Sequence, residues 1–167
     1  MTSRRVEVHH THGPGPTLWH WSEHRSVVRT SLNWVLMALA RVSPSFRVKN
    51  GLYRMMRCRV GERVAVGLEA TFDVLYPELI DIGDDVTVGY STTILCHEYI
   101  HGEYRTGPVV LGARATIGAN CTILPGVTVG ADAIVSAMSL VNRDVPAGEF
   151  WGGVPVRRLR ARAKDEG

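Results

Sequence analysis

A chain of 167 residues, 45% of them hydrophobic, is long enough for one domain with its own core. Its three cysteines are odd in number and lack CxxC spacing, which argues against a disulfide framework and favours a reducing compartment, the cytoplasm. The net charge of +3 conceals an asymmetry, because residues 1–63 carry 11 basic and 3 acidic side chains, whereas residues 64–156 carry 3 basic and 11 acidic. We expect the basic part to pack on the acidic part rather than to bind nucleic acid or an anionic membrane.

The N-terminal segment 1–20 lacks periodicity and is predicted to be a mobile tail. It contains several histidines, among them His9, His10 and His12, but we expect no designed metal site there. No apolar run with a cleavage motif follows its basic start, so a signal peptide is not expected.

A helical segment is predicted for residues 21–58. Between about 22 and 42, apolar residues recur at the spacing of one helix face. These residues are Val28, Leu32, Val35, Leu36, Leu39 and Val42. Pro44 should end this helix, and a second short helix at about 46–56 should lead into the next segment at Val60.

Two destinations remain open for the helix at 22–42. Its longest uncharged run, residues 30–40, has 11 residues and is too short to span a bilayer. The arginines and Trp34 of this helix would also suit a peripheral, interfacial position on a membrane. We favour packing against the rest of the chain or against a partner subunit, because that is the commoner fate of an apolar helix face.

From Ile82 to Val145 the sequence repeats itself every six residues. Aliphatic residues stand at the repeat positions Ile82, Val88, Ile94, Leu111, Ile117, Ile123, Val129, Val135 and Val141. This period fits neither an α-helix nor a simple strand, and a sandwich of strands would show turn signals about every 8–12 residues. It is typical of a coil in which each hexapeptide forms a short strand and a corner, and in which successive coils stack into a column.

The repeat is interrupted between Ile94 and Leu111, and we predict a loop insertion at 97–109. Insertions in a solenoid lie at corners and often face a binding site. Titratable and aromatic side chains crowd into this one: His97, Glu98, Tyr99, His101, Glu103, Tyr104 and Arg105. A neutral imidazole in this loop could accept a proton as a general base.

Cysteine chemistry is a less favoured alternative. Cys96 adjoins His97, but no local basic group would obviously lower the pKa of its thiol. Cys121 occupies an inward repeat position and is interpreted as a small buried hydrophobe.

The stretch LGARATIGANCTILPGVTVGADAIVSAMSLVNRDVPAGEFWGGVPVRRLR resembles the C-terminal half of the hexapeptide-repeat acyltransferases, in the branch of maltose, galactoside and nodulation-factor O-acetyltransferases. The resemblance covers about residues 45–160 and includes IGANCTILPGVTVG, RDVP and a GGVP followed by basic residues. It implies a mainly β fold, a left-handed parallel β-helix over residues 59–156. It also implies a homotrimer that binds acetyl-CoA between neighbouring subunits.

In this family the catalytic histidine stands where the coil leads into a comparable loop, and His97 matches it best. Many relatives have Thr-His-Pro at this point, whereas this chain has Cys-His-Glu, and His101 therefore remains a second candidate. A carboxylate could orient the imidazole, and either Asp73 or Glu98 could supply it. Galactoside-type relatives have a serine where this chain has Ala119, which leaves only a backbone amide as an oxyanion donor in the donor site.

The resemblance also implies a binding site for CoA. Further matches to residues that line CoA fall at Ser136, Ala137, Asn142, Arg143, Arg157 and Arg160. The first two match the pantetheine arm, the next two match a Thr-Lys pair near the phosphates, and the two arginines match basic residues at the nucleotide end. A planar guanidinium suits phosphate because it forms paired, charge-assisted hydrogen bonds. The alternative is that 157–167 is only a solvated basic tail.

The sequence therefore predicts an acetyl-CoA-dependent O-acetyltransferase, without a metal cofactor, that acts on a hydroxyl of a sugar or another polar acceptor. The candidates for holding the acceptor are Glu98, Tyr99, Tyr104 and Arg105. A longer acyl group and an amine acceptor stay open. So do two other functions, a non-enzymatic scaffold and a γ-class zinc carbonic anhydrase. The latter requires three histidine ligands, whereas the coil contains only His97 and His101.

Overall fold

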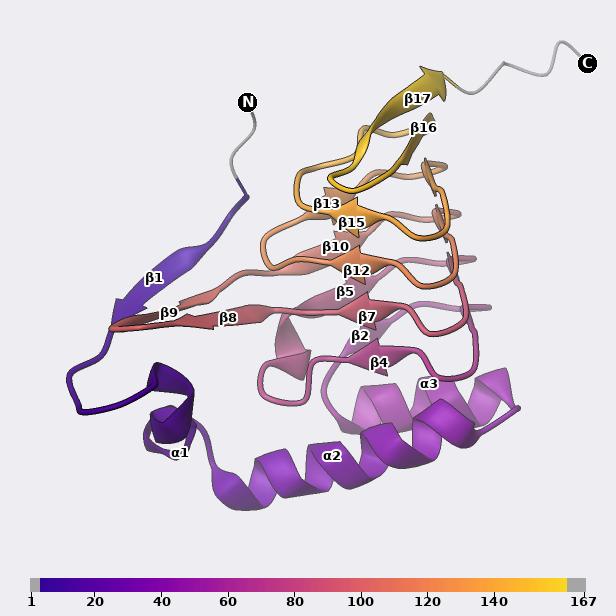
Figure 1. Cartoon of the computed structure of the whole chain (residues 1–167). Helices are drawn as coiled ribbons and strands as arrows, with labels where there is room; N and C mark the ends of the chain where they lie inside the picture. Colours follow the sequence, from indigo (N-terminus) through magenta and orange to yellow (C-terminus); the bar gives the residue numbers. More distant parts are fainter. Residues whose placement is uncertain (1–3, 162–167) are drawn as a thin grey trace, which may run out of the picture.

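The computed structural model describes residues 4–161, which form a three-sided column of β-coils standing on two helices (Figure 1). Each face of the column is a parallel sheet, and the chain visits the three faces in turn. The first face contains β2 (Arg59–Val60), β5 (Ile80–Ile82), β10 (Val109–Leu111) and β13 (Thr128–Val129). The second contains β3 (Ala65–Val66), β6 (Thr87–Val88), β11 (Thr116–Ile117), β14 (Ile134–Val135) and β16 (Glu149–Gly152). The third contains β4 (Thr71–Phe72), β7 (Thr93–Ile94), β12 (Thr122–Ile123) and β15 (Leu140–Val141).

The interior of the column is filled by the repeat positions. All nine aliphatic side chains of the predicted series are buried, as are Val60, Val66 and Phe72 of the coil that precedes it. Coils stack closely enough that a side chain at some corners would collide with the next coil. A Cβ atom on Gly118 would lie 2.4 Å from the backbone nitrogen of Ala137, so only glycine fits there.

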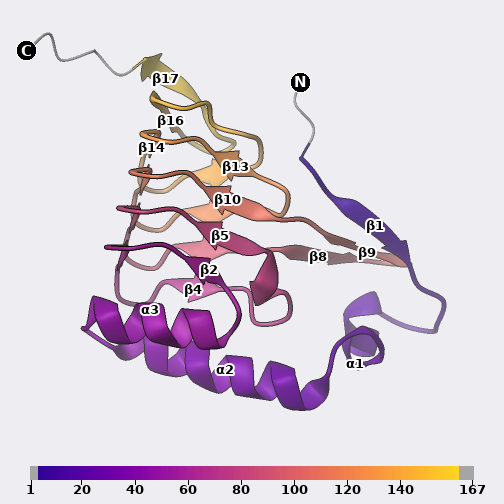
Figure 2. The ribbon, with the colours of Figure 1, turned by 180° about the vertical axis from the view of Figure 1, so that it is seen from behind.

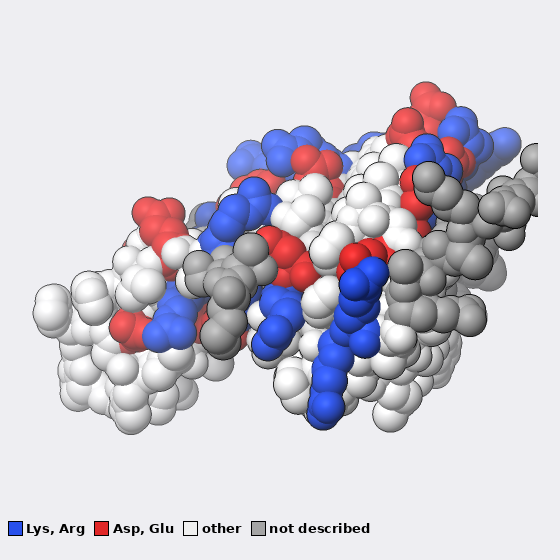
Figure 3. All heavy atoms as spheres, turned by 90° about the horizontal axis from the view of Figure 1, so that it is seen from above, with Lys and Arg blue, Asp and Glu red and all other residues white. Residues whose placement is uncertain are grey.

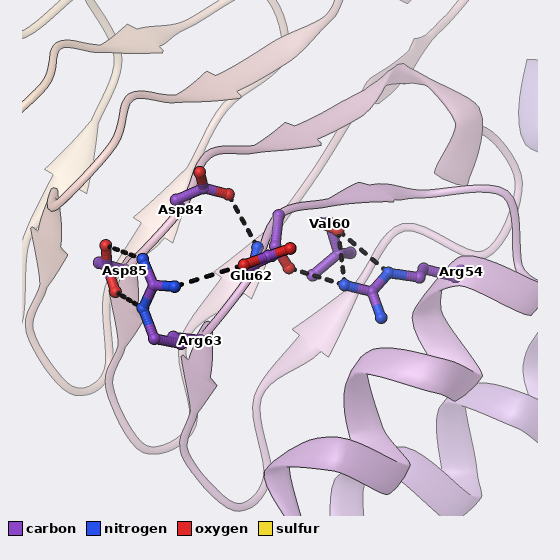
Figure 4. A network of polar contacts seen from close by, with 7 residues as sticks. Arg54, Val60, Glu62, Arg63, Asp84 and Asp85 are labelled. Carbon is purple, nitrogen blue, oxygen red and sulfur yellow. Dashed lines mark hydrogen bonds and ion pairs between the residues drawn. The ribbon is translucent and has the colours of Figure 1, made fainter.

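Two helices close the lower end of the column, α2 (Val27–Val42) and α3 (Phe46–Met55). Side chains of α3 satisfy carbonyl groups that the first coil would otherwise leave without a partner. Lys49 donates to the carbonyls of Val66 and Gly67, and Asn50 donates to that of Val64. The guanidinium of Arg54 donates to the carbonyls of Val60 and Gly61 (Figure 4). We call the surface of α2 and α3 that faces away from the coils the base.

Helix α2 differs from the sequence prediction in the face that it buries. It begins after Ser26, whose side chain accepts a hydrogen bond from the amide of Arg29, and it ends before Pro44 as expected. The residues that it buries are Asn33, Leu36, Met37 and Ala40. Most of the predicted apolar face is instead exposed, because the coil takes up the side that carries Asn33, whose amide donates to the carbonyl of Val74.

The insertion forms an antiparallel ribbon of β8 (His97–Ile100) and β9 (Glu103–Thr106), which projects from the third face. A third strand, β1 (Glu7–His10), pairs with the free edge of β9 (Figures 1 and 2). This differs from the expectation of an irregular tail over 1–20, since the edge of β9 offers backbone hydrogen bonds to any extended segment. A 3-10 turn (Thr17–His20) and the short helix α1 (Trp21–His24) connect β1 to α2.

The upper end also differs from the prediction of a simple tail at 157–167. The described part of that segment, β17 (Arg157–Ala161), pairs antiparallel with β16 and so covers the edge of the second face. Residues 162–167 lie outside the described residues. Seen from above, acidic and basic side chains lie side by side on the column (Figure 3). Among the ion pairs between successive coils are Arg63 with Asp85 and Arg114 with Asp132. Within residues 4–161, no helix is long and apolar enough to cross a membrane.

Candidate active site

The corner after the third face brings together side chains from two coils. Phe72 of β4 pairs with Ile94 of β7, so the residues that follow these strands lie one above the other. Asp73 follows β4 directly, and His97 begins the ribbon that follows β7. The six-residue repeat therefore places a carboxylate and an imidazole from distant parts of the sequence at the same corner.

Asp73 is held by four hydrogen bonds. One carboxylate oxygen, Oδ1, accepts from the amides of Leu75 at 2.8 Å and Tyr76 at 3.0 Å. The other, Oδ2, accepts from the amide of Cys96 at 2.7 Å and lies 2.5 Å from Nδ1 of His97. The Asp73 side chain is fully buried, whereas that of His97 is 19% exposed. The pair is therefore rigid at the carboxylate and open to solvent at the imidazole.

The pKa of Asp73 reflects two opposed effects. Burial on its own would raise the pKa of this carboxyl, but the hydrogen bond and the charge of His97, together with the amides of Tyr76 and Cys96, lower it below its ordinary value. The carboxylate is thus ionised near neutral pH and can only accept hydrogen bonds. The proton of a neutral His97 must then lie on Nδ1, which leaves the lone pair of Nε2 free to accept a proton.

Aromatic rings enclose the imidazole. The ring of Tyr99 lies 5.3 Å from that of His97 in an edge-on arrangement, and the ring of Tyr76 lies 5.8 Å away. The guanidinium of Arg25 stacks over Tyr76 at 4.4 Å and also pairs with Glu78. Burial raises the pKa of both tyrosines, so their hydroxyls remain protonated at neutral pH.

A pocket of about 290 Å³ opens beside the pair, between α2 and the column. Its walls come from both sides: Trp34, Met37, Ala38 and Arg41 of α2, and Thr71, Phe72, Asp73, Val74, Leu95 and His97 of the coils. Arg41 pairs with Glu69 at 2.5 Å. The pocket thus offers the imidazole, an indole and a guanidinium to a small polar molecule.

The predicted acceptor residues are mostly engaged with one another and with residues of the N-terminal segment. Glu98 pairs with Arg4 at 2.9 Å on the ribbon, so it is Asp73 that contacts His97. Arg105 pairs with Glu103 at 2.6 Å. The ring of Tyr104 is stacked by those of His9, His24 and Tyr99. The alternative base, His101, lies exposed at the turn of the ribbon.

The cysteines are buried and free. Burial, and secondly the charge of Asp73, raise the pKa of the Cys96 thiol far above its ordinary value. Burial also raises the pKa of Cys121, whose thiol donates to the carbonyl of Ser136 at 3.1 Å. Neither thiol is available as a thiolate nucleophile at neutral pH.

The predicted CoA residues fall at two corners of the third face. Ala119 and Ala137 precede β12 and β15, and the amide after Ala137 donates to the carbonyl of Ala119, so these two residues stack. Asn142 and Arg143 follow β15, at the corner that carries His97 in a lower coil. Ser136 lies at the same corner as Ala137, since the two are adjacent. Within one chain the fold therefore does not bring Ala119, Ser136 and Ala137 together with Asn142 and Arg143.

The two predicted arginines lie on β17 at the upper end, where the side chain of Arg157 is exposed. The side chain of Arg160 lies outside the described part of the chain. No three His, Cys, Asp or Glu side chains in residues 4–161 gather in a way that could hold a metal ion.

Sequence reasoning missed the residues that line the site from outside the ribbon. Tyr76 lies in an irregular segment where the repeat gives no signal. Trp34 and Arg41 were noted on the helix, but nothing in the helical pattern indicated which side of α2 would meet the pocket.

The column, with its hexapeptide coils and a ribbon at one corner, has the architecture of a left-handed parallel β-helix transferase. Residues 108–143 match the family described as bacterial transferase hexapeptide (six repeats). YvoF, a protein of Bacillus subtilis that carries the name of an acetyltransferase, is 42% identical over 155 residues, which cover 92% of this chain and 90% of YvoF. The chain therefore belongs to the hexapeptide-repeat acetyltransferase family.

Solved structures agree with this assignment. The hexapeptide-repeat acetyltransferase VCA0836 of Vibrio cholerae superposes with a TM-score of 0.70 at 26% identity, over 82% of this chain and 92% of that chain. Its complex with acetyl-CoA superposes with a TM-score of 0.67. A further relative in sequence, galactoside O-acetyltransferase of Escherichia coli, is 33% identical over 88 residues, which cover 48% of this chain and 43% of that protein. The predicted fold and family are confirmed.

Proposed function

We propose that this protein transfers an acetyl group from acetyl-CoA to a hydroxyl group, with His97 as the general base. The observation that carries the proposal is the contact between Nδ1 of His97 and the buried carboxylate of Asp73, beside a pocket. This contact leaves Nε2 as the proton acceptor and supports the imidazolium that forms when it takes a proton.

The reaction follows from this arrangement. Nε2 of His97 takes the proton of the acceptor hydroxyl as the oxygen attacks the thioester carbonyl. The resulting oxyanion is stabilised by a backbone amide, for which Ala119 is the candidate. The C–S bond then breaks, and the imidazolium returns the proton to the thiolate of CoA. The products are an acetyl ester and free CoA.

The acceptor that we favour is a sugar or another polar molecule with hydroxyl groups. The indole of Trp34 could stack on the apolar face of a sugar ring, while Arg41 could donate hydrogen bonds to its oxygens. Tyr99 borders His97 and could bind the part of the acceptor that reaches beyond the pocket. The name of the galactoside O-acetyltransferase that shares part of this sequence agrees with such an acceptor.

The donor that we favour is acetyl-CoA, which is bound by the similar protein VCA0836. We assign the pantetheine arm to the corner of Ala119, Ser136 and Ala137, and the phosphates to Asn142, Arg143, Arg157 and Arg160. Because Ala137 and His97 lie at opposite ends of the third face, a homotrimer with sites between subunits would let one chain supply His97 and its neighbour the wall of Ala137. The three free thiols support a reducing compartment such as the cytoplasm.

Two histidine variants test this function. His97→Ala should lower the release of CoA thiol by about 100- to 10,000-fold, the usual contribution of a general base. His101→Ala is the matched control, since its side chain lies at the exposed turn of the same ribbon, and it should keep near-normal turnover. Loss of activity in His101→Ala alone would overturn the assignment. Paired hydroxyl and amine acceptors in this assay distinguish O- from N-acetylation.

A further inference from the structure

The base of the molecule exposes an apolar stripe. Five residues of α2 at alternating spacings of four and three are 45–81% exposed: Val28, Leu32, Val35, Leu39 and Val42. Such spacing places them on one face of the helix, away from Asn33, Met37 and Ala40, which the column covers. Exposed apolar residues of α3 extend the surface: Phe46, Val48 and Met55. Contiguous apolar surface of this kind marks a site of interaction rather than ordinary exposure.

The charge of the base has one sign. Neither α2 nor α3 contains an aspartate or glutamate. Three arginines of these helices and the turn after them have no carboxylate within 4.0 Å and no hydrogen bond to the coil among the described residues: Arg29, Arg47 and Arg57. The column differs, because acidic side chains lie beside its basic ones (Figure 3). An apolar surface on helices that carry basic but no acidic side chains is complementary to an anionic apolar partner.

The positive charge of the base discriminates between two possible partners of the apolar stripe, a second copy of α2 and an anionic bilayer. A second copy of α2 could interdigitate with the stripe, because the spacing is that of a coiled-coil seam. Such a pairing would bring the basic bases of two copies together, and neither α2 nor α3 has an acidic side chain to offset their charge. An anionic bilayer offers acyl chains to the stripe and phosphates to the arginines, which satisfies both features.

We propose that the base is a docking face for the anionic surface of a lipid bilayer, on which α2 lies in the plane of the interface. The sequence alone favoured packing of this helix against the coil or a partner. Exposure of the stripe and the absence of acidic residues from the base are the observations that favour the membrane. Docking is peripheral, in keeping with the lack of a membrane-crossing helix within residues 4–161.

The docking face is joined to the candidate active site. Trp34, Ala38 and Arg41 recur at spacings of four and three on a third side of α2, and they line the pocket beside His97. Trp34 is 64% exposed, and tryptophan prefers the interface between water and acyl chains. Docking would set the pocket at the membrane surface, where hydroxyl groups of lipid headgroups are accessible. This consequence, unlike the docking itself, rests on the proposed function.

Vesicle sedimentation tests the proposal with the full chain. Vesicles of phosphatidylcholine alone and of phosphatidylcholine with phosphatidylglycerol are compared at low and high salt. We expect binding to the anionic vesicles, weakened by salt because the arginine contribution is screened. Arg47→Gln with Arg57→Gln should lower the affinity roughly 30-fold, from about 1 kcal/mol for each basic residue near the surface. Leu32→Asp with Leu39→Asp should abolish binding.

Matched variants on the column serve as controls. Tyr90→Asp adds a charge at an apolar residue that is 54% exposed, and Arg114→Gln removes a cation. Both should bind vesicles like the native protein. His97→Ala should also bind normally, which separates docking from catalysis. Failure of the native protein to bind anionic vesicles, or equal binding by the base variants, would overturn the proposal. So would a fall in assembly mass caused by Leu32→Asp with Leu39→Asp, since the stripe would then join copies of this chain.

Discussion

The carboxylate of Asp73 lies 2.5 Å from Nδ1 of His97, although 24 residues separate the two in sequence. Parallel register between β4 and β7 creates this contact, because each strand delivers its next residues to the same corner. The carboxylate is also bound by three amides and cannot follow a moving imidazole. Asp73 is therefore well suited to orient the imidazole ring without exchanging a proton with the acceptor itself.

Replacing this carboxylate should slow turnover. We expect Asp73→Asn to lower kcat by about 100-fold or more, within the range of a general-base contribution, with little change in KM for acetyl-CoA. An amide carries no charge to stabilise the imidazolium that forms as His97 takes the proton, so the loss should fall on kcat and not on the binding of acetyl-CoA. Steady-state kinetics measures kcat and KM separately. A purely structural role for Asp73 would not separate the two constants in this way.

Glu98→Gln is the control for Asp73→Asn, because Glu98 pairs with Arg4 on the ribbon. It should keep kcat within a few-fold of the native value. Equal losses in the two variants, or normal kinetics in Asp73→Asn, would contradict the orienting role of Asp73.

Acid should destabilise the fold through the same residue. The pKa of Asp73 is lowered in the folded state, so the folded protein binds fewer protons than the unfolded chain, whose aspartates titrate near pH ~3.9. The stabilisation is complete above that pH and is lost as the pH falls through the folded-state value. Urea unfolding at pH 7 and below pH 4 should show that Asp73→Asn has a smaller loss on acidification than the native protein. An equal loss would show that Asp73 does not contribute.

The sequence could predict the column because its repeat reports a single physical requirement, an inward aliphatic residue once per strand. The candidate pair was harder to predict. Asp73 and Glu98 were equally plausible partners of His97, because the register that separates them is a property of the stacked coils. The pairing of β1 with the ribbon was also not predictable, since an exposed strand edge in one segment leaves no pattern in another. The exposed side of α2 followed from contacts of Asn33 and Met37 with the column, which periodicity does not reveal.

Close stacking of the coils should make one glycine irreplaceable and leave another free. Gly118→Ala would set a Cβ atom 2.4 Å from the backbone nitrogen of Ala137, and the clash should destabilise the fold by about 1–3 kcal/mol. Gly51→Ala in α3 meets no atom within 4 Å and should stabilise the protein by about 0.5–1 kcal/mol. Urea unfolding of the two variants measures the contrast. A neutral Gly118→Ala would show that the coils can separate at this corner.

The shared active site of the proposed homotrimer can be tested by mixing inactive chains. Ala137 is exposed just before β15, whereas His97 follows β7 at the other end of the same face, so one chain alone separates the two groups. His97→Ala and Ala137→Trp should each be inactive when assembled separately. In an equal co-assembly, about one quarter of the interfaces should combine an intact His97 with an intact Ala137 and regain activity. Ala137→Ser is the control for the bulky side chain and should be active when it is assembled on its own. A mixture that stays inactive, or a monomeric mass in light scattering at full activity, would place each site within a single chain.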